Sequence, residues 1–86
     1  MGAQKEAIKM AIKDEILGHF RKKNAKPGDT LSIPWLYDDF LPSLSNKEHQ
    51  ALEETLNEMI HEGLLTYVNG PRANYALTAK GKAIMC

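Results

Sequence analysis

The chain has 86 residues, of which 43% are hydrophobic and 26% are charged, and its formal net charge at pH 7 is zero. This length and composition fit one compact domain, residues 1–86, that hides roughly two-thirds of its unfolded surface. No apolar run approaches the roughly 18 residues that a membrane span needs, and the start of the chain lacks the apolar block of a signal peptide. We therefore expect a cytoplasmic protein with no membrane partner.

The charges are sorted along the sequence. Residues 1–28 carry seven basic and three acidic side chains, residues 29–62 carry one basic and eight acidic ones, and residues 63–86 carry three basic and no acidic ones. This division is not that of a uniformly basic nucleic-acid-binding protein. Folding can still bring the two basic ends together, or the charges can simply keep the helices soluble.

A first helix is predicted over residues 3–23. Apolar side chains recur there every four residues, at Ile8, Ile12, Ile16 and Phe20, and Ala11 and Leu17 flank them. This period indicates an amphipathic helix with one buried stripe. Its end is basic and is formed by Arg21, Lys22 and Lys23, with Lys26 close behind. Such a cluster more often offsets the negative end of the helix dipole than binds phosphate.

A short strand and a second helix are predicted next. Residues 30–33 alternate polar and apolar side chains, as a half-buried strand does. Pro34 fits the first turn of a helix, and Pro42 with the polar residues through Asn46 is expected to end that helix. Its apolar face is formed by Trp35, Leu36, Phe40 and Leu41. An aromatic residue at helical spacing is more often packed than used for binding, so we expect Trp35 to anchor the core.

A third helix is predicted over residues 47–62. Ser45 and Glu48 match the capping box, in which two side chains satisfy free N–H groups at the start of a helix. Gly63 supplies the stop. One face is apolar, with Leu52, Leu56, Met59 and Ile60. The opposite face is polar and displays His49, Gln50, Glu53, Glu54, Asn57, Glu58 and His61.

A β-hairpin is predicted after the third helix. Residues 64–68 and 73–78 are rich in strand-forming side chains, and residues 69–72 form the loop between them. Tyr67 and Tyr75 are expected to face each other across the two strands. Thr78 is suited to cap a last short helix. The predicted order is helix, short strand, helix, helix, strand, loop and strand, which is an α+β arrangement.

The hairpin resembles the wing of winged-helix regulators of the PadR and MarR kind. The resemblance rests on residues 62–66 (EGLLT), 70–72 (GPR) and 75–81 (YALTAKG). Those families commonly show a glycine-leucine helix exit and a tyrosine-x-leucine-threonine-x-x-glycine return strand. The resemblance implies a winged helix-turn-helix fold, with a three-helix core, a short β-strand and a C-terminal hairpin wing.

By the same resemblance, the chain would be a small DNA-binding regulator or accessory factor in transcription. Arg72 at the wing tip would reach the minor groove or a phosphate. The third helix would present Lys47, His49, Gln50 and Asn57 to the major groove. The basic cluster of Arg21, Lys22, Lys23 and Lys26 would hold phosphates.

The charge of the third helix supports an alternative. Residues 47–62 include five glutamates and one lysine, and docking such a helix against phosphates costs energy. The chain could instead be a protein-interaction or dimerisation module that uses Glu53, Glu54, Glu58 and His61. The regulators it resembles usually continue past the wing into dimer-forming helices, whereas this chain ends five residues after Gly81. Any homodimer would then use the first helix.

We expect no enzyme, metal site or cofactor. His61 and Glu62 begin a zinc-protease motif, but Leu65 stands where the second histidine must be. His49 and His61 are too far apart on one helix to hold one ion. Cys86 is the single cysteine and has no fixed base beside it, so a nucleophile is not expected.

Overall fold

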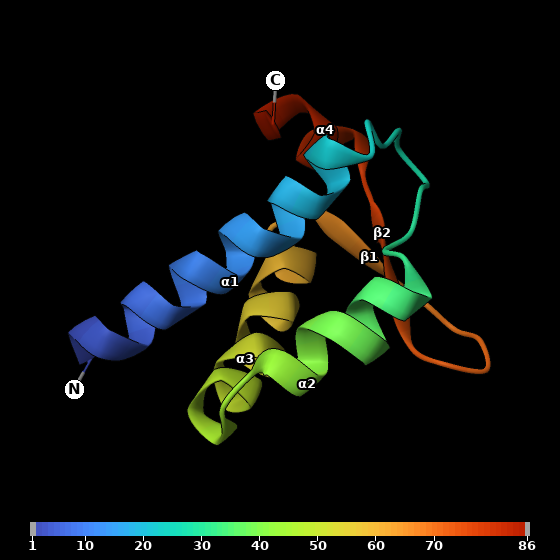
Figure 1. Cartoon of the computed structure of the whole chain (residues 1–86). Coiled ribbons are helices and arrows are strands. Elements are labelled where there is room, and N and C mark those ends of the chain that lie inside the picture. Colours follow the sequence, from blue (N-terminus) through green and yellow to red (C-terminus); the bar gives the residue numbers. More distant parts are fainter. Residues whose placement is uncertain (1, 86) are drawn as a thin grey trace.

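The computed structural model describes residues 2–85, so Cys86 lies outside the described part of the chain (Figure 1). Its elements are α1 (Gly2–Lys22), η1 (Pro34–Phe40), α2 (Leu41–Ser43), α3 (Asn46–His61), β1 (Leu65–Val68), β2 (Asn74–Leu77) and α4 (Ala79–Met85). This is a compact α+β domain, as the sequence predicted. The bounds predicted for the first helix, the third helix and both hairpin strands each differ from these by one residue.

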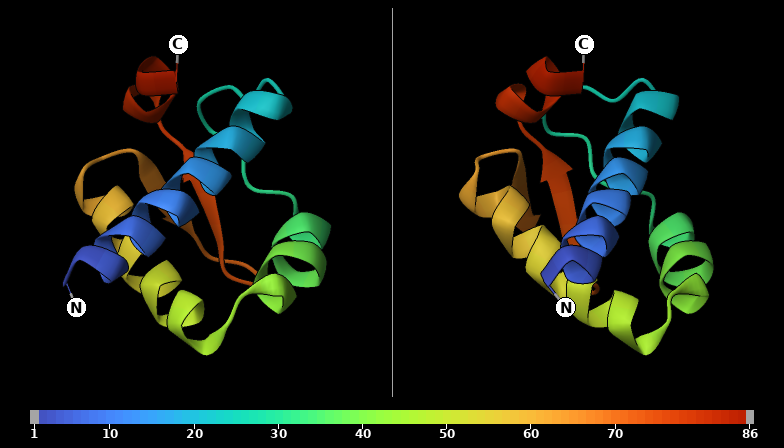
Figure 2. Two further views of the ribbon diagram at one scale, coloured as in Figure 1. Left: turned by 60° about the vertical axis from the view of Figure 1, so that its left-hand side comes forward. Right: turned by 90° about the vertical axis from the view of Figure 1, so that its left-hand side faces the viewer.

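The core lies between α1 and α3. The stripe predicted on the first helix is buried at Ile12, Ile16 and Phe20, while Ala11, expected beside it, is exposed. Figure 2 shows α1 crossing over α3, with the hairpin behind α1. From α3, Leu52, Leu56 and Met59 complete the core. Burying an apolar side chain of this size contributes about 1.5–3 kcal/mol, so this contact holds the domain together.

Helix α3 begins and ends where the sequence predicts. The Ser45 N–H group donates to the Glu48 carboxylate at 2.9 Å, and the Glu48 N–H group donates to Ser45 Oγ at 3.3 Å. These hydrogen bonds lower the pKa of the Glu48 carboxyl, because they favour its charged form. Gly63 follows the helix with φ at +80°, a conformation that favours glycine. The predicted capping box and the predicted stop are both confirmed.

The strand predicted over residues 30–33 is wrong beyond its first residue. Thr30 forms an isolated bridge to Ala76, whereas Ile33 already has helical angles, with φ at −59° and ψ at −47°. The helix takes this residue because the Ser32 carbonyl accepts a hydrogen bond from the Leu36 N–H group at 2.8 Å. The alternating pattern was therefore too short to decide between strand and helix.

Strand β2 is nevertheless bonded along both edges. On one edge it pairs antiparallel with β1, and Tyr67 lies opposite Tyr75 with the ring centroids 5.8 Å apart, as predicted. On the other edge, the N–H groups of Gly28 and Leu31 donate to the carbonyls of Leu77 and Tyr75. The Leu77 N–H group donates to the Asp29 carbonyl. The buried Asn74 amide adds a bond to the Leu31 carbonyl at 2.8 Å. The segment after α1 is thus held against the hairpin.

The second helix has a wide turn that the sequence did not predict. Its first seven residues are π-helical, and the Leu41 N–H group donates to the Leu36 carbonyl five residues back. This turn brings Trp35 and Phe40 onto one side, where their rings stack 4.7 Å apart. Pro42 and the polar residues after it were expected to end the helix, and the helix ends within them, at Ser43. A proline has no N–H group to donate, so it fits where the hydrogen-bonding pattern changes.

Trp35 packs against the core, as expected, although it is only half-buried. Its ring also stacks on His19 with the centroids 4.1 Å apart. His19 Nε2 lies 3.5 Å from the Ser32 N–H group, which donates to it. Burial, and then the nearby charges of Lys23 and Lys22, lower the pKa of His19 below 6.5. His19 is therefore neutral at pH 7, which this acceptor role requires.

The pKa of His19 makes stability depend on pH. Because the folded pKa is depressed, the stabilisation is complete above pH 6.5 and is lost as the pH falls through the folded pKa. We expect His19→Gln, which keeps an acceptor but does not titrate, to lose less stability on acidification. Thermal melts should show a larger drop in melting temperature between pH 7.5 and pH 5 for the parent protein than for the variant. Equal losses would contradict this role of His19.

Candidate nucleic-acid interface

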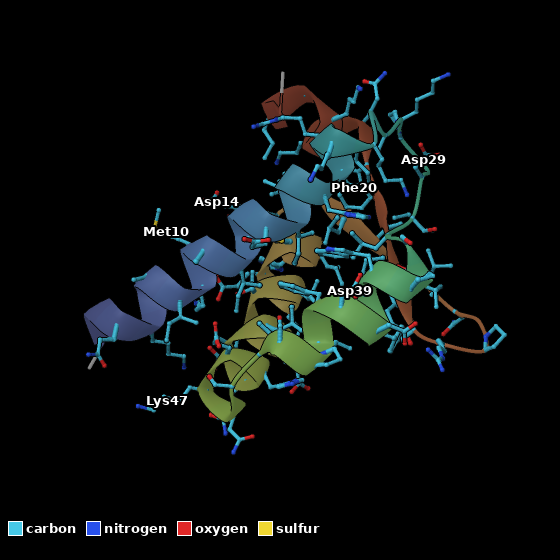
Figure 3. The ribbon with its side chains drawn as sticks, viewed as in Figure 1. Met10, Asp14, Phe20, Asp29, Asp39 and Lys47 are labelled. Atoms are coloured by element: carbon cyan, nitrogen blue, oxygen red, sulfur yellow. The ribbon has the colours of Figure 1, made fainter. Side chains whose placement is uncertain are left out.

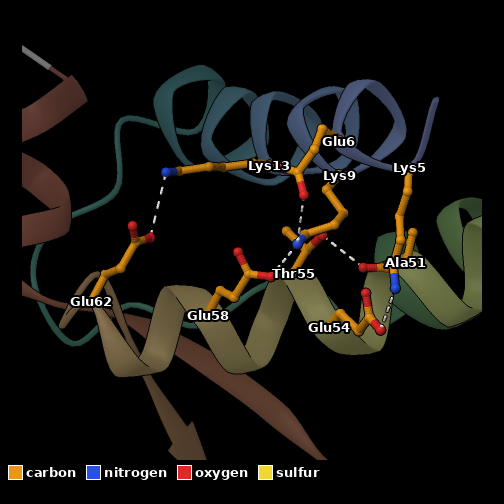
Figure 4. A network of polar contacts seen from close by, with 9 residues as sticks. All are labelled: Lys5, Glu6, Lys9, Lys13, Ala51, Glu54, Thr55, Glu58 and Glu62. Carbon is orange, nitrogen blue, oxygen red and sulfur yellow. Dashed lines mark hydrogen bonds and ion pairs between the residues drawn. The ribbon is translucent and has the colours of Figure 1, made fainter. Parts of the chain in front are cut away.

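The acidic side of α3 is paired with α1. Three lysines of α1 contact three glutamates of α3 in register, and we call these contacts the ion-pair ladder (Figure 4). Its rungs are Lys5–Glu54 at 2.8 Å, Lys9–Glu58, and Lys13–Glu62 at 3.5 Å. Lys9 also lies 3.5 Å from Glu6 of its own helix.

The register follows from equal spacing on the two helices. Residues four apart lie on one side of an α-helix, so Lys5, Lys9 and Lys13 form a row that matches the row of glutamates. The two helices run in the same direction along this contact. Lys5 lowers the pKa of the Glu54 carboxyl, and Glu58 raises the pKa of the Lys9 amine. Both directions favour the charged forms that the ladder uses.

The ladder matters for surface charge more than for stability. Ion pairs between exposed side chains typically contribute only about 0.2–1 kcal/mol each. They do change the electrostatic potential around α3, because each of these glutamates has a cation within a few ångströms. Two of these glutamates, Glu54 and Glu58, were predicted on an exposed polar face. The signal that could have corrected that prediction is the matching four-residue period of lysines in the first helix and glutamates in the third.

The remaining exposed side of α3 is mostly uncharged. We call Gln50, Glu53, Asn57 and His61 the outer face of α3, and all four are exposed. Lys47 and His49 are exposed at the start of the same helix. A groove of about 360 Å³ runs between this part of α3 and the first turns of α1, and its lining includes Lys47, Gln50 and Gln4. Amide groups of this kind can read the edges of bases.

Arg72 is held near α3 through the second helix. Its guanidinium lies over the Tyr37 ring, 4.9 Å from the ring centroid, and the Tyr37 hydroxyl donates to the Ala73 carbonyl. Tyr37 also lines a groove of about 270 Å³ together with His49 and Glu53 of α3. Tyr37 therefore links Arg72 of the hairpin loop to the side of α3 that carries His49 and Glu53. Lys47 and Gln50 lie on the other side of α3, in the groove that faces α1.

The other predicted phosphate contacts lie elsewhere. Arg21, Lys22, Lys23 and Lys26 gather where α1 ends, and α4 adds Lys82 there and Lys80 beside Gly63; we call these six residues the basic pole. The Lys82 amine donates to the Ala25 carbonyl at 2.9 Å. In Figure 3, Lys47 lies at the opposite end of the molecule from Asp29, which follows the basic cluster. The sequence analysis missed Lys80 and Lys82, whose positions only the packing of α4 decides.

The protein-interface residues are also divided. Glu54 and Glu58 belong to the ion-pair ladder, whereas Glu53 and His61 are exposed on the outer face of α3. The dimer predicted through the first helix would have to use the side of α1 that turns away from α3. Ala7, Met10 and Ala11 are exposed on α1. That dimer stays a prediction.

Within residues 2–85, no cluster of three histidine, cysteine, aspartate or glutamate side chains is arranged to hold a metal ion. None of the described helices combines the length and the apolar character that crossing a membrane requires. Comparisons of the chain with protein-family models, with curated proteins and with solved structures found no match.

Proposed function

We propose that this chain is a winged-helix DNA-binding protein, a regulator or an accessory factor. The first half of α3 would enter the major groove, where Gln50, His49 and Lys47 meet base edges and phosphates. Arg72 in the hairpin loop would contact a flanking phosphate or the minor groove. The order of the elements supports this proposal, and so does β2, which is hydrogen-bonded to β1 on one edge and to residues 28–31 on the other.

The observation that carries the proposal is the ion-pair ladder. An α-helix with five glutamates would normally repel phosphates. Here Glu54, Glu58 and Glu62 each have a lysine of α1 as partner, so their charge is compensated within the chain. The outer face of α3 then offers amides and an imidazole, with Glu53 as its one carboxylate. Such a face suits hydrogen bonding to bases.

The same observation bears on the alternative, an acidic interface for a protein partner. A basic partner would have to compete with Lys5 and Lys9 for Glu54 and Glu58. Only Glu53 and His61 of the predicted interface residues remain on the outer face of α3. The charge argument that favoured a protein partner is therefore weaker in the folded chain, and DNA is the better supported partner.

Few phosphate contacts are available at this interface. Lys47 and Arg72 are its cations, and the exposed Asp38 and Asp39 lie on the neighbouring η1. Two phosphate contacts predict a slope of about −2 for the logarithm of the binding constant against the logarithm of the salt concentration. Binding should therefore survive at a salt concentration of about 150 mM, where it rests mainly on hydrogen bonds.

Fluorescence anisotropy with a labelled 20-base-pair duplex of mixed sequence, at about 150 mM salt, tests the proposal. We expect Arg72→Ala to weaken binding about fivefold, because it removes one phosphate contact. Lys80→Gln removes the same charge from α4, outside the proposed interface, and should change binding less than about twofold. Absence of binding even at low salt, or equal effects of the two substitutions, would overturn the proposed function.

A further inference from the structure

The basic pole concentrates positive charge from two distant parts of the chain. Its cations come from the last turn of α1, from the turn that follows it and from α4. The one carboxylate in that turn is Asp29, which accepts a hydrogen bond from the Lys26 N–H group at 2.9 Å. Among residues 2–85, no ion pair joins Lys22, Lys23, Lys26, Lys80 or Lys82 to a carboxylate. Positive charge therefore predominates at the pole, and Asp14 and Glu15 border it in the groove that they share with Lys22.

The pole is held in a fixed shape. Its turn contains two residues with positive φ, Asn24 at 54° and Gly28 at 96°. Three hydrogen bonds hold this turn in place. The Ala25 N–H group donates to the Phe20 carbonyl at 2.9 Å, and the Gly28 N–H group donates to the Leu77 carbonyl at 2.8 Å. Lys82 of α4 donates to the Ala25 carbonyl. The backbone that carries these cations is thus fixed before any partner arrives, which lowers the entropy cost of binding.

Compensation of the helix dipole accounts for only part of this charge. Arg21, Lys22 and Lys23 lie at or beside the carbonyl end of α1, where cations are favourable. Lys80 lies in the first turn of α4, where the dipole disfavours a cation. The folded chain holds Lys82 beside the basic end of α1 although like charges repel. A polyanionic partner would offset that repulsion.

The pole lies away from the interface of the proposed function. Lys47 and the turn at Asp29 are at opposite ends of the molecule in Figure 3, and β2 separates the hairpin loop from α4. Helix α3 alone has 16 residues and spans about 24 Å. A straight duplex that takes the first half of α3 into its groove would leave the pole facing outward.

From this geometry we propose that the basic pole is a second phosphate-binding surface, which holds the backbone of a second DNA duplex, so that one molecule bridges two duplexes. The inference rests on the proposed function for the first duplex. The pole presents lysine amines and an arginine but no cluster of amides, so it binds phosphates without reading sequence. Its binding is therefore more sensitive to salt than binding at α3.

A bridging assay tests this inference. One biotinylated 20-base-pair duplex is fixed on beads, a second fluorescent duplex is added, and protein-dependent capture is measured at about 50 mM salt. The variant Lys22→Gln, Lys26→Gln, Lys80→Gln removes three exposed cations and spares Lys23 and Lys82, which bond to main-chain carbonyls. We expect it to lose capture at least about tenfold, while its binding to one duplex at about 150 mM salt changes less than about twofold.

The outcomes separate this inference from the proposed function. If the parent protein binds one duplex and captures no second one, the inference is overturned and the proposed function stands. Capture that persists in the triple variant also overturns it, because another surface or a dimer then joins the duplexes. The variant Arg72→Ala should lose capture as well, since bridging needs both surfaces. Capture that survives Arg72→Ala but not the triple substitution would support the pole and count against the α3 interface.

Discussion

Alanine at Gly81 is expected to destabilise the protein by about 2–3 kcal/mol, because the added methyl group has no space. A Cβ atom there would lie 2.4 Å from the Leu64 carbonyl oxygen and 2.8 Å from Leu77 Cδ1. The first contact is with main chain, which cannot rotate away, so α4 would have to move off the hairpin. Urea denaturation monitored by the fluorescence of Trp35 measures the free energy of unfolding.

Gly18→Ala is the matched control, since the same atom is added to another helix. A Cβ at Gly18 would meet nothing within 4 Å. Glycine inside a helix costs roughly 0.5–1 kcal/mol relative to alanine, so this variant should be more stable by about that amount. Similar changes in both variants would show that α4 does not pack on Leu64 as closely as described.

The second large effect concerns the ion-pair ladder. We expect the variant Lys5→Gln, Lys9→Gln, Lys13→Gln to bind a 20-base-pair duplex about tenfold more weakly, because Glu54, Glu58 and Glu62 lose their partners and repel phosphates. Glutamine keeps most of each side chain, so the packing of α1 on α3 is largely retained. Fluorescence anisotropy at about 150 mM salt measures the change, and a thermal melt checks the fold.

Two controls isolate the local effect from net charge. The triple substitution of Lys22, Lys26 and Lys80 by glutamine changes the net charge equally but at the basic pole, and it should leave binding to one duplex almost unchanged. The converse variant Glu54→Gln, Glu58→Gln, Glu62→Gln should bind DNA more tightly. If the ladder lysines and the pole lysines had equal effects, masking of the α3 glutamates would be rejected. Gain of binding to a basic protein in the first variant would favour the acidic-interface alternative.

The motif that suggested a wing has a physical basis at each position. Leu77 is buried, and Thr78 donates its hydroxyl to the Gly63 carbonyl and accepts from the Gly81 N–H group at 3.0 Å. Gly81 then allows α4 to approach the Leu64 carbonyl. The resemblance is therefore explained by how a strand passes into a short helix. That requirement concerns the fold and carries no information about the partner.

Most element bounds could be predicted because their causes are local. The four-residue period of α1, the Ser45 capping box and the Gly63 stop each act within a few residues, and all three are confirmed. The second helix was harder to predict. Its wide turn depends on Trp35 stacking between His19 of α1 and Phe40, and no local rule contains that contact.

The interface could be predicted only in part. His49 lines one groove with Tyr37, on which Arg72 is stacked, whereas Lys47 and Gln50 line a second groove between α3 and α1. The cluster at Arg21 to Lys26 does not join them, because β2 and the length of α3 separate the two ends. Its neighbour in the fold is Lys82 of α4. Charges that lie far apart in the sequence could not be grouped before the chain was folded.

The sequence by itself determined the helices, the hairpin and the buried stripes, since side-chain period, capping and turn residues act over short distances. It also determined the presence of an acidic third helix. Only the tertiary structure decided what that acidity means, because Lys5 and Glu54 are separated by 49 residues and meet only when α1 packs on α3. Electrostatic energy depends on distance in space, so the same glutamates that argue against DNA in the sequence are compensated in the fold.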